Sequence, residues 1–172
     1  MNLKDYITTI PDFPEKGIMF RDITTLLQNG EAFSYAVKEI AKFAKEKGAN
    51  VIVGPEARGF LLGSMLATSM GCGFIPVRKK DKLPPSIVAS KVSYIKEYGE
   101  DVLELPKLVN DDYKDKKFYI VDDIYATGNT MKAISTKIEE LGGIVAGEGV
   151  IMNIKELNNN DDLFSLIDIN EE

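Results

Sequence analysis

The chain has 172 residues, of which 44% are hydrophobic, and 27 acidic against 21 basic residues give a formal net charge of −6. The length suits a single domain, over residues 1–172, with a sizeable core. The acidic balance disfavours a general nucleic-acid binder, because such a protein needs a basic surface. Histidine is absent, which excludes Ser-His-Asp and Cys-His catalysis and zinc sites built on histidine.

The sequence also indicates where the protein works. No apolar run approaches the length of a membrane span, and residues 1–13 lack the apolar region of a signal peptide. The single cysteine, Cys72, lies among small and apolar residues, as is typical of a core position in a reducing compartment. We therefore expect a cytoplasmic protein that has no membrane partner.

The first elements in chain order are a loop and a helix. Residues 10–24, IPDFPEKGIMFRDIT, are punctuated by prolines, and their composition indicates a loop. Apolar residues at helical spacing then predict a helix over 32–47, which Gly48 ends.

Two short apolar runs, 51–53 and 74–77, predict strands on either side of a second helix over 60–70. The glycine-flanked loop GPEARG, residues 54–59, opens that helix and carries Arg58, whose guanidinium suits a phosphate. A basic group follows the second strand and consists of Arg78, Lys79, Lys80 and Lys82. The polar and mixed residues 79–98 predict either a mobile loop or a small ribbon.

Residues 118–130, FYIVDDIYATGNT, are the most informative stretch of the chain. The apolar run 118–121 has the length of a buried parallel strand, and two carboxylates, Asp122 and Asp123, end it. A loop of small and hydroxyl residues leads into a helical pattern over 130–141. Such a loop directs free backbone N–H groups and the positive end of the helix dipole at one point, which suits a phosphate. The two carboxylates suit ribose hydroxyls or a magnesium ion.

Further strands over 144–154 and 163–169 complete an alternation of strands and helices. This alternation predicts an α/β protein with a mainly parallel sheet and helices on both faces. Ligands bind such sheets at the carboxyl ends of the strands, where the loops 54–59 and 122–130 both lie. The chain has neither a P-loop motif nor a dinucleotide-binding glycine motif. A ligand with phosphate at both ends of a ribose would explain the two loops and the basic group together.

Stretch 118–130 resembles the phosphoribosyl-pyrophosphate (PRPP) motif of the type I phosphoribosyltransferases. Over roughly residues 10–154 the chain is most similar to the members of that family that use adenine. The resemblance implies a Rossmann-like sheet, a small N-terminal hood over about residues 1–30 and a mobile loop. In the family, two acids hold the ribose hydroxyls and the next loop wraps the 5′-phosphate. The matching residues here are Asp122, Asp123, Ala126, Thr127, Gly128, Asn129 and Thr130.

Three more segments carry the resemblance. Segment 10–24 is similar to the family's base-recognition segment, which implies that Met19 and Arg21 bind the purine. GPEARGF resembles the pyrophosphate loop, which implies that Arg58 binds the diphosphate and that the peptide between Glu56 and Ala57 is cis. In VRKKDKLP, the resemblance assigns Arg78 and Lys82 to the pyrophosphate.

KEYGEDVLEL, residues 96–105, is similar to the family segment whose Glu-Tyr pair closes over the site, here Glu97 and Tyr98. With histidine absent, Glu97 is the candidate proton acceptor for the purine. The chain departs from the family's usual residues at three positions. Asn129 stands where adenine enzymes have a second glycine, Lys96 replaces an apolar residue, and Pro55 occupies a variable position.

The resemblance implies an enzyme of purine salvage that transfers the 5-phosphoribosyl group from PRPP to adenine, giving AMP and pyrophosphate. It also implies a homodimer and Mg²⁺ as the cofactor, held by PRPP near Asp122 and Asp123. Two alternatives stay open. The base could be hypoxanthine, guanine or xanthine, because only residues 10–24 argue for adenine. A PRPP-sensing regulator on the same fold is the second, although it would usually add a DNA-binding domain or a basic face.

Overall fold

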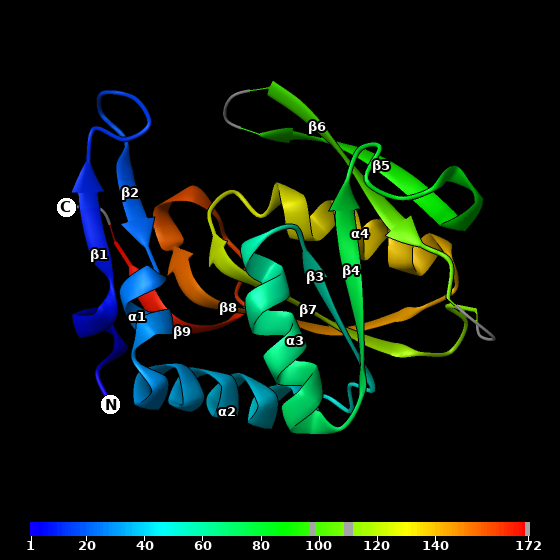
Figure 1. Cartoon of the computed structure of the whole chain (residues 1–172), viewed down its shortest axis with the longest axis horizontal. Coiled ribbons are helices and arrows are strands. Elements are labelled where there is room, and N and C mark those ends of the chain that lie inside the picture. The colour runs from blue at the N-terminus through cyan, green and yellow to red at the C-terminus, as the bar shows by residue number, and fades with distance from the viewer. Residues whose placement is uncertain (97–98, 109–111, 171–172) are drawn as a thin grey trace.

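A seven-stranded sheet forms the centre of the computed structural model, which describes residues 1–96, 99–108 and 112–170 (Figure 1). The strand order is β5-β6-β4-β3-β7-β8-β9. The strand bounds are Val51–Pro55 for β3, Gly73–Lys79 for β4, Val88–Lys96 for β5, Gly99–Pro106 for β6, Lys117–Tyr125 for β7, Ile144–Ile154 for β8 and Phe164–Ile169 for β9. Strands β4, β3, β7, β8 and β9 are parallel to one another, which confirms the predicted mainly parallel sheet.

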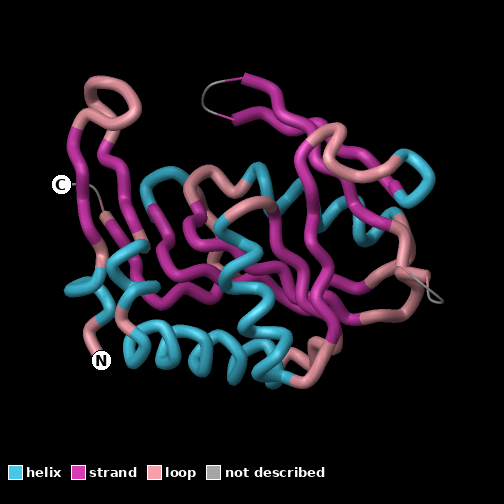
Figure 2. The backbone as a smooth tube through the Cα atoms, in the orientation of Figure 1, coloured by secondary structure: helices cyan, strands magenta, loops and turns pink. Residues whose placement is uncertain are grey.

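Helices cover both faces of this sheet (Figure 2). Helices α2 (Gly30–Glu46) and α3 (Arg58–Met70) lie on one face, and α4 (Asn129–Glu140) lies on the other. Successive side chains of a strand point to opposite faces, so alternate residues of β7 enter two different cores. Tyr119 and Val121 pack with the side of α2 and α3, whereas Phe118 and Ile120 pack with the side of α4.

Residues 10–24, which composition indicates as a loop, contain most of a small antiparallel sheet. Strand β1 (Thr8–Pro11) pairs with β2 (Met19–Asp22), so that Ile10 lies opposite Phe20. The short helices η1 (Leu3–Tyr6) and α1 (Thr24–Gln28) flank this hairpin. The hairpin stands beside the end of the large sheet that carries β9, as the expected hood would (Figure 1).

Of the two interpretations of residues 79–98, the structure shows the ribbon. Strand β5 pairs antiparallel with β6 over most of its length, after a short helix η2 (Pro85–Ile87). Strand β6 also pairs with the end of β4, where Arg78 lies opposite Glu104. The residues predicted to close over the site, Glu97 and Tyr98, lie outside the described part of the chain.

Strand β7 corrects the prediction that the strand ends at the two aspartates. It continues to Tyr125 because β8 runs beside it, with Asp122 opposite Val150 and Tyr125 opposite Asn153. The aspartates therefore lie within a strand, and only residues 126–128 separate it from α4. In the described residues, no helix is long and apolar enough to cross a membrane.

Candidate active site

A cavity of about 390 Å³ opens at the carboxyl ends of β3 and β7. Its lining comes from the loop after β3, the ribbon strand β5, the end of β7 and the start of α4. The lining residues are Pro55, Glu56, Arg58, Tyr94, Ile95, Asp122, Asp123, Ile124, Ala126, Thr127, Asn129 and Thr130. Seven residues predicted from the sequence thus meet in one cavity, and Gly128 lines a smaller cavity that shares most of the same loop.

Arg58 and the two aspartates form the charged centre of the cavity. The Arg58 Nε atom lies 3.0 Å from Asp123 Oδ2, and the Asp123 backbone N–H donates to Asp122 Oδ1 over 2.9 Å. Burial, and then the charge of Asp123, raise the pKa of Asp122 well above its usual range. Burial also raises the pKa of Asp123, and the Arg58 charge opposes that shift. The charged centre therefore holds two carboxyl groups against one cation.

Asp123 Oδ2 is a buried oxygen that accepts no hydrogen bond from the described residues. The nearby Arg58 guanidinium forms an ion pair with it without hydrogen-bonding geometry. Buried polar atoms are normally satisfied, because an unmade hydrogen bond costs about 1–3 kcal/mol. This oxygen is thus suited to accept a hydrogen bond from a ligand hydroxyl.

The phosphate-loop candidate, residues 126–130, leads into α4 through a left-handed residue. Gly128 has φ of +79° at the helix N-cap, and its carbonyl accepts from the Lys132 N–H over 2.9 Å. The following N–H groups begin a twelve-residue helix, so they and the helix dipole favour an anion at this point. The Asn129 side chain donates to the Ile95 carbonyl over 3.0 Å and so ties the loop to the ribbon.

Two arginines with acidic partners lie at this edge of the sheet, Arg58 after β3 and Arg78 near the end of β4. The peptide between Glu56 and Ala57 is cis, as the family resemblance implies. Glu56 accepts from Arg78 Nε over 2.9 Å and from the Lys79 backbone N–H over 3.0 Å. These two contacts, the backbone one first, lower the pKa of Glu56 and keep it charged. Arg78 uses one of its five donors there, which leaves its terminal nitrogens for an anion.

The hairpin brings Phe20 and Asp22 toward this charged centre. The Arg58 guanidinium carbon lies 5.8 Å from the centre of the Phe20 ring. Asp22 accepts hydrogen bonds from Thr24, which together with the Arg58 charge lower its pKa. An aromatic ring beside Arg58, which in turn pairs with Asp123, offers a stacking surface for a flat base. The resemblance assigns the base to segment 10–24, in which Phe20 stands between Met19 and Arg21, but it does not single out Phe20, because the pairing of β1 with β2 sets which residues of β2 share a face.

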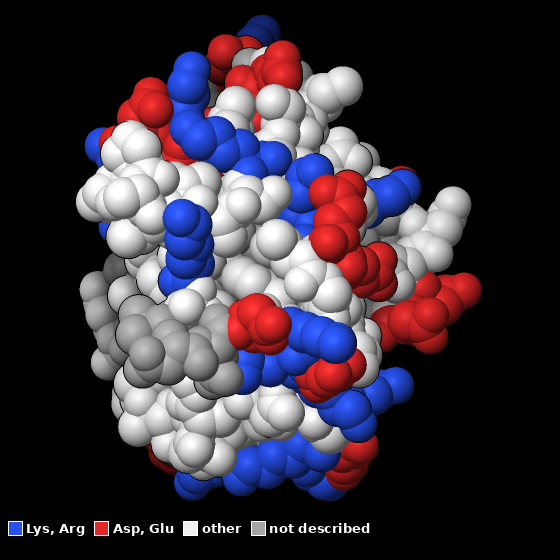
Figure 3. Space-filling view, turned by 90° about the vertical axis from the view of Figure 1, so that its right-hand side faces the viewer, with Lys and Arg blue, Asp and Glu red and all other residues white. Residues whose placement is uncertain are grey.

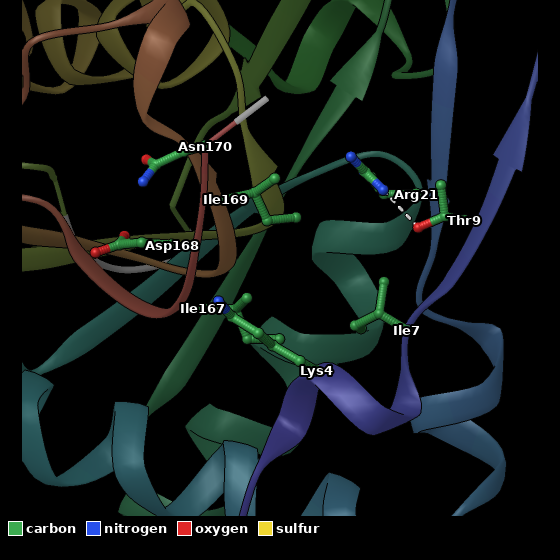
Figure 4. Close-up of a pocket in the computed structure, with 8 residues that line it drawn as sticks. All are labelled: Lys4, Ile7, Thr9, Arg21, Ile167, Asp168, Ile169 and Asn170. Carbon is green, nitrogen blue, oxygen red and sulfur yellow. Dashed lines mark hydrogen bonds between the residues drawn. The ribbon is translucent and has the colours of Figure 1, made fainter. Parts of the chain in front are cut away.

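Met19, Arg21, Arg78 and Lys82 do not line this cavity. The Arg21 side chain donates to the Thr9 hydroxyl and lines a second cavity, of about 540 Å³, between the hairpin and the end of β9 (Figure 4). In Figure 4, Arg21 and Thr9 lie across from Ile169 and Asn170. Met19 is 43% exposed. The roles that the resemblance implies for these four residues stay predictions.

Mg²⁺ fits the carboxylates only as a partner of a bound diphosphate. Within the described residues, no three acidic, cysteine or histidine side chains gather closely enough to hold a metal. Mg²⁺ commonly uses one or two carboxylates and takes its remaining ligands from water and substrate phosphates. Asp122 and Asp123 supply such a pair and would hold the ion together with the ligand.

Comparison with known proteins agrees with this geometry. A family model described as the phosphoribosyl transferase domain matches residues 24–156. The chain belongs to the phosphoribosyltransferase family. Among solved structures of this family, it is 40% identical to the adenine phosphoribosyltransferase of Thermoanaerobacter pseudethanolicus, with a TM-score of 0.88, covering 97% of this chain and 98% of the other.

Two further phosphoribosyltransferases match over nearly their whole length. The adenine phosphoribosyltransferase of Rhodothermus marinus is 35% identical, with a TM-score of 0.85, covering 97% of this chain and 96% of that one. The Saccharomyces cerevisiae enzyme is 34% identical, with a TM-score of 0.86 and 96% of each chain covered. That structure holds adenine together with an imino-altritol bisphosphate.

Proposed function

We propose that this protein transfers the 5-phosphoribosyl group from PRPP to adenine, giving AMP and pyrophosphate in purine salvage. The observation that carries the proposal is the meeting of Asp122 and Asp123, the loop 126–130 and Arg58 in one cavity. The two aspartates match the ribose hydroxyls of PRPP, the loop matches its 5′-phosphate, and Arg58 matches its diphosphate. The adenine phosphoribosyltransferases that resemble the chain over nearly its whole length support the choice of reaction.

The reaction breaks the bond between ribose C1 and the diphosphate, and negative charge builds on the leaving group. Arg58 and Arg78, on neighbouring segments, are placed to stabilise that charge by electrostatics. Lys82, four residues beyond Arg78, would add a third cation. When bound, Mg²⁺ neutralises part of the diphosphate charge.

Positive charge builds on the ribose ring at the same time. Asp122 and Asp123 would hold the ring hydroxyls, and in their ionised form their negative field favours a cationic ring. The loop 126–130 would hold the 5′-phosphate, so that binding energy far from C1 fixes the geometry of attack. The Phe20 ring, near Arg58, would support the flat face of the purine.

The attacking purine nitrogen must lose a proton, and we assign that step to Glu97, with Tyr98 beside it. The assignment rests on the family resemblance and on the absence of histidine from the chain. A general base of this kind contributes a factor of about 10²–10⁴ to the rate.

The two alternative functions are less well supported. The related structures named above are all adenine enzymes, which does not favour hypoxanthine, guanine or xanthine as the base. A DNA-binding regulator would need a basic surface, whereas on the face drawn in Figure 3 the Lys and Arg side chains lie among Asp and Glu side chains.

We also propose a homodimer, in which α3 provides part of the interface. Leu61 and Met65, one helical turn apart, are 48% and 47% exposed on the helix that follows the diphosphate loop. An exposed apolar pair of this kind suits a second copy of the chain. Sedimentation at micromolar concentration should give twice the mass of 19.1 kDa, and a monomer would contradict the proposal. Cytoplasmic location and a single domain stay predictions from the sequence.

The decisive experiment measures conversion of labelled adenine to AMP. Product should form only when PRPP and Mg²⁺ are both present, and unlabelled adenine should compete better than hypoxanthine, guanine or xanthine. Preferred turnover of another base would revise the substrate. Absence of turnover with all four bases, together with retardation of DNA in a gel, would favour the regulator.

A further inference from the structure

The asparagine-rich segment 158–160 lies against the beginning of the phosphate loop. The Asn158 side-chain nitrogen lies 2.8 Å from the Ala126 carbonyl oxygen. It also lies 2.9 Å from Asn153 Oδ1 and 3.0 Å from the Ile154 carbonyl. The two carbonyls can only accept, so the nitrogen of the amide must face them. The sequence alone assigns no chemistry to this segment.

Asn160 contacts Tyr125, the last residue of β7, which directly precedes the phosphate loop. Its side-chain nitrogen donates to the Tyr125 hydroxyl and to Glu148 Oε2, both over 3.1 Å. The Asn160 backbone N–H in turn donates to Asn158 Oδ1 over 3.2 Å, which joins the two amides into one network. Tyr125 is 7% exposed, and its ring lies against Gly128, where an added Cβ would overlap the hydroxyl.

The contact with Ala126 has a direct consequence for phosphate binding. The peptide bond between Ala126 and Thr127 is trans, so its C=O and N–H point in opposite directions. Asn158 draws the carbonyl to one side and thereby fixes the Thr127 N–H on the other side. Backbone N–H groups bind a phosphate only when their directions are set, because they cannot rotate independently of the peptide plane.

We propose that Asn158 and Asn160 are positioning residues for the 5′-phosphate of PRPP. Neither residue lines the cavity that holds Arg58, Asp122 and Asp123, so they act through Ala126 and Tyr125. The C-terminal segment of the chain thus sets the geometry of a loop more than 30 positions earlier. The proposal rests on the assignment of residues 126–130 to the 5′-phosphate.

The test compares Asn158→Ala with Asn159→Ala. Asn159 is an exposed neighbour that does not line the cavity, so the same chemical change there is a matched control. Ribose 5-phosphate and inorganic pyrophosphate serve as probes for the two ends of the PRPP site, with binding measured by calorimetry. Asn158→Ala should weaken ribose 5-phosphate at least tenfold and pyrophosphate less than twofold. Asn159→Ala should change neither.

Equal weakening of both probes would show that Asn158 only supports the fold, and unchanged binding would show that it has no role; either result overturns the proposal. If Asn158→Ala does not fold, Asn160→Ala decides, because the same selective loss is expected of it. Gly128→Ala separates the two hypotheses. If this variant binds ribose 5-phosphate as the wild type does, the loop assignment fails. If it loses binding while both asparagine variants keep theirs, only the positioning role fails.

Discussion

Replacing Gly128 with alanine should damage both the stability of the protein and its phosphate site. An L-residue at φ of +79° costs about 1–2 kcal/mol. The new Cβ would overlap the Tyr125 hydroxyl and lie 2.7 Å from Tyr125 Cε1, and overpacking of this kind costs about 1–3 kcal/mol. Together the two effects should lower the free energy of unfolding by about 2–5 kcal/mol, a large share of the about 5–15 kcal/mol typical of a folded protein.

Gly71→Ala is the matched control, because Gly71 has a similar φ of +67° but open space around its Cβ position. Urea unfolding should show a loss of about 1–2 kcal/mol for Gly71→Ala and a clearly larger loss for Gly128→Ala. Calorimetry should show weakened ribose 5-phosphate binding for Gly128→Ala alone. Equal losses of stability in the two variants would refute the contact with Tyr125. Unchanged binding by Gly128→Ala would refute the place of the loop in phosphate recognition.

Three other substitutions test the rest of the site. Arg58→Ala should weaken the binding of pyrophosphate more than the binding of AMP, since AMP lacks the diphosphate. Equal losses of affinity for the two ligands would show that Arg58 pairs with Asp123 and does not bind the diphosphate. The raised pKa of Asp122 means that the folded protein binds more protons than the unfolded chain, so stability falls as pH rises above the unfolded value of about 3.9. Asp122→Asn should therefore raise the Tm at neutral pH, with a gain that shrinks on acidification, while PRPP affinity falls; a lower Tm at neutral pH would contradict this. Glu97→Gln should lower kcat by about 10²-fold with little change in the KM for PRPP, and near-native kcat across pH would assign the proton to another group.

The sequence by itself determined the local elements and the chemistry of the main loop. Apolar residues at helical spacing predicted α2 over 32–47, and the structure has Gly30–Glu46. The stretch 118–130 predicted a buried strand, two carboxylates and a helix N-terminus suited to a phosphate. These features depend on residues close together in the chain, so periodicity and composition report them directly. The order of strands and helices was enough to predict a mainly parallel sheet.

Only the tertiary structure decided which distant residues meet. The pairing of β7 with β8 extends the strand past Asp122 and Asp123, and the β1–β2 hairpin brings Phe20 to Arg58. The contact of Asn158 with Ala126 joins residues 32 positions apart. No local sequence pattern predicts these three contacts. Each contact depends on how strands pair and loops close between segments that are far apart in the chain. The physical reason is that hydrophobic periodicity determines which face of a helix or strand is buried. The packing of whole elements determines which other elements lie against that face.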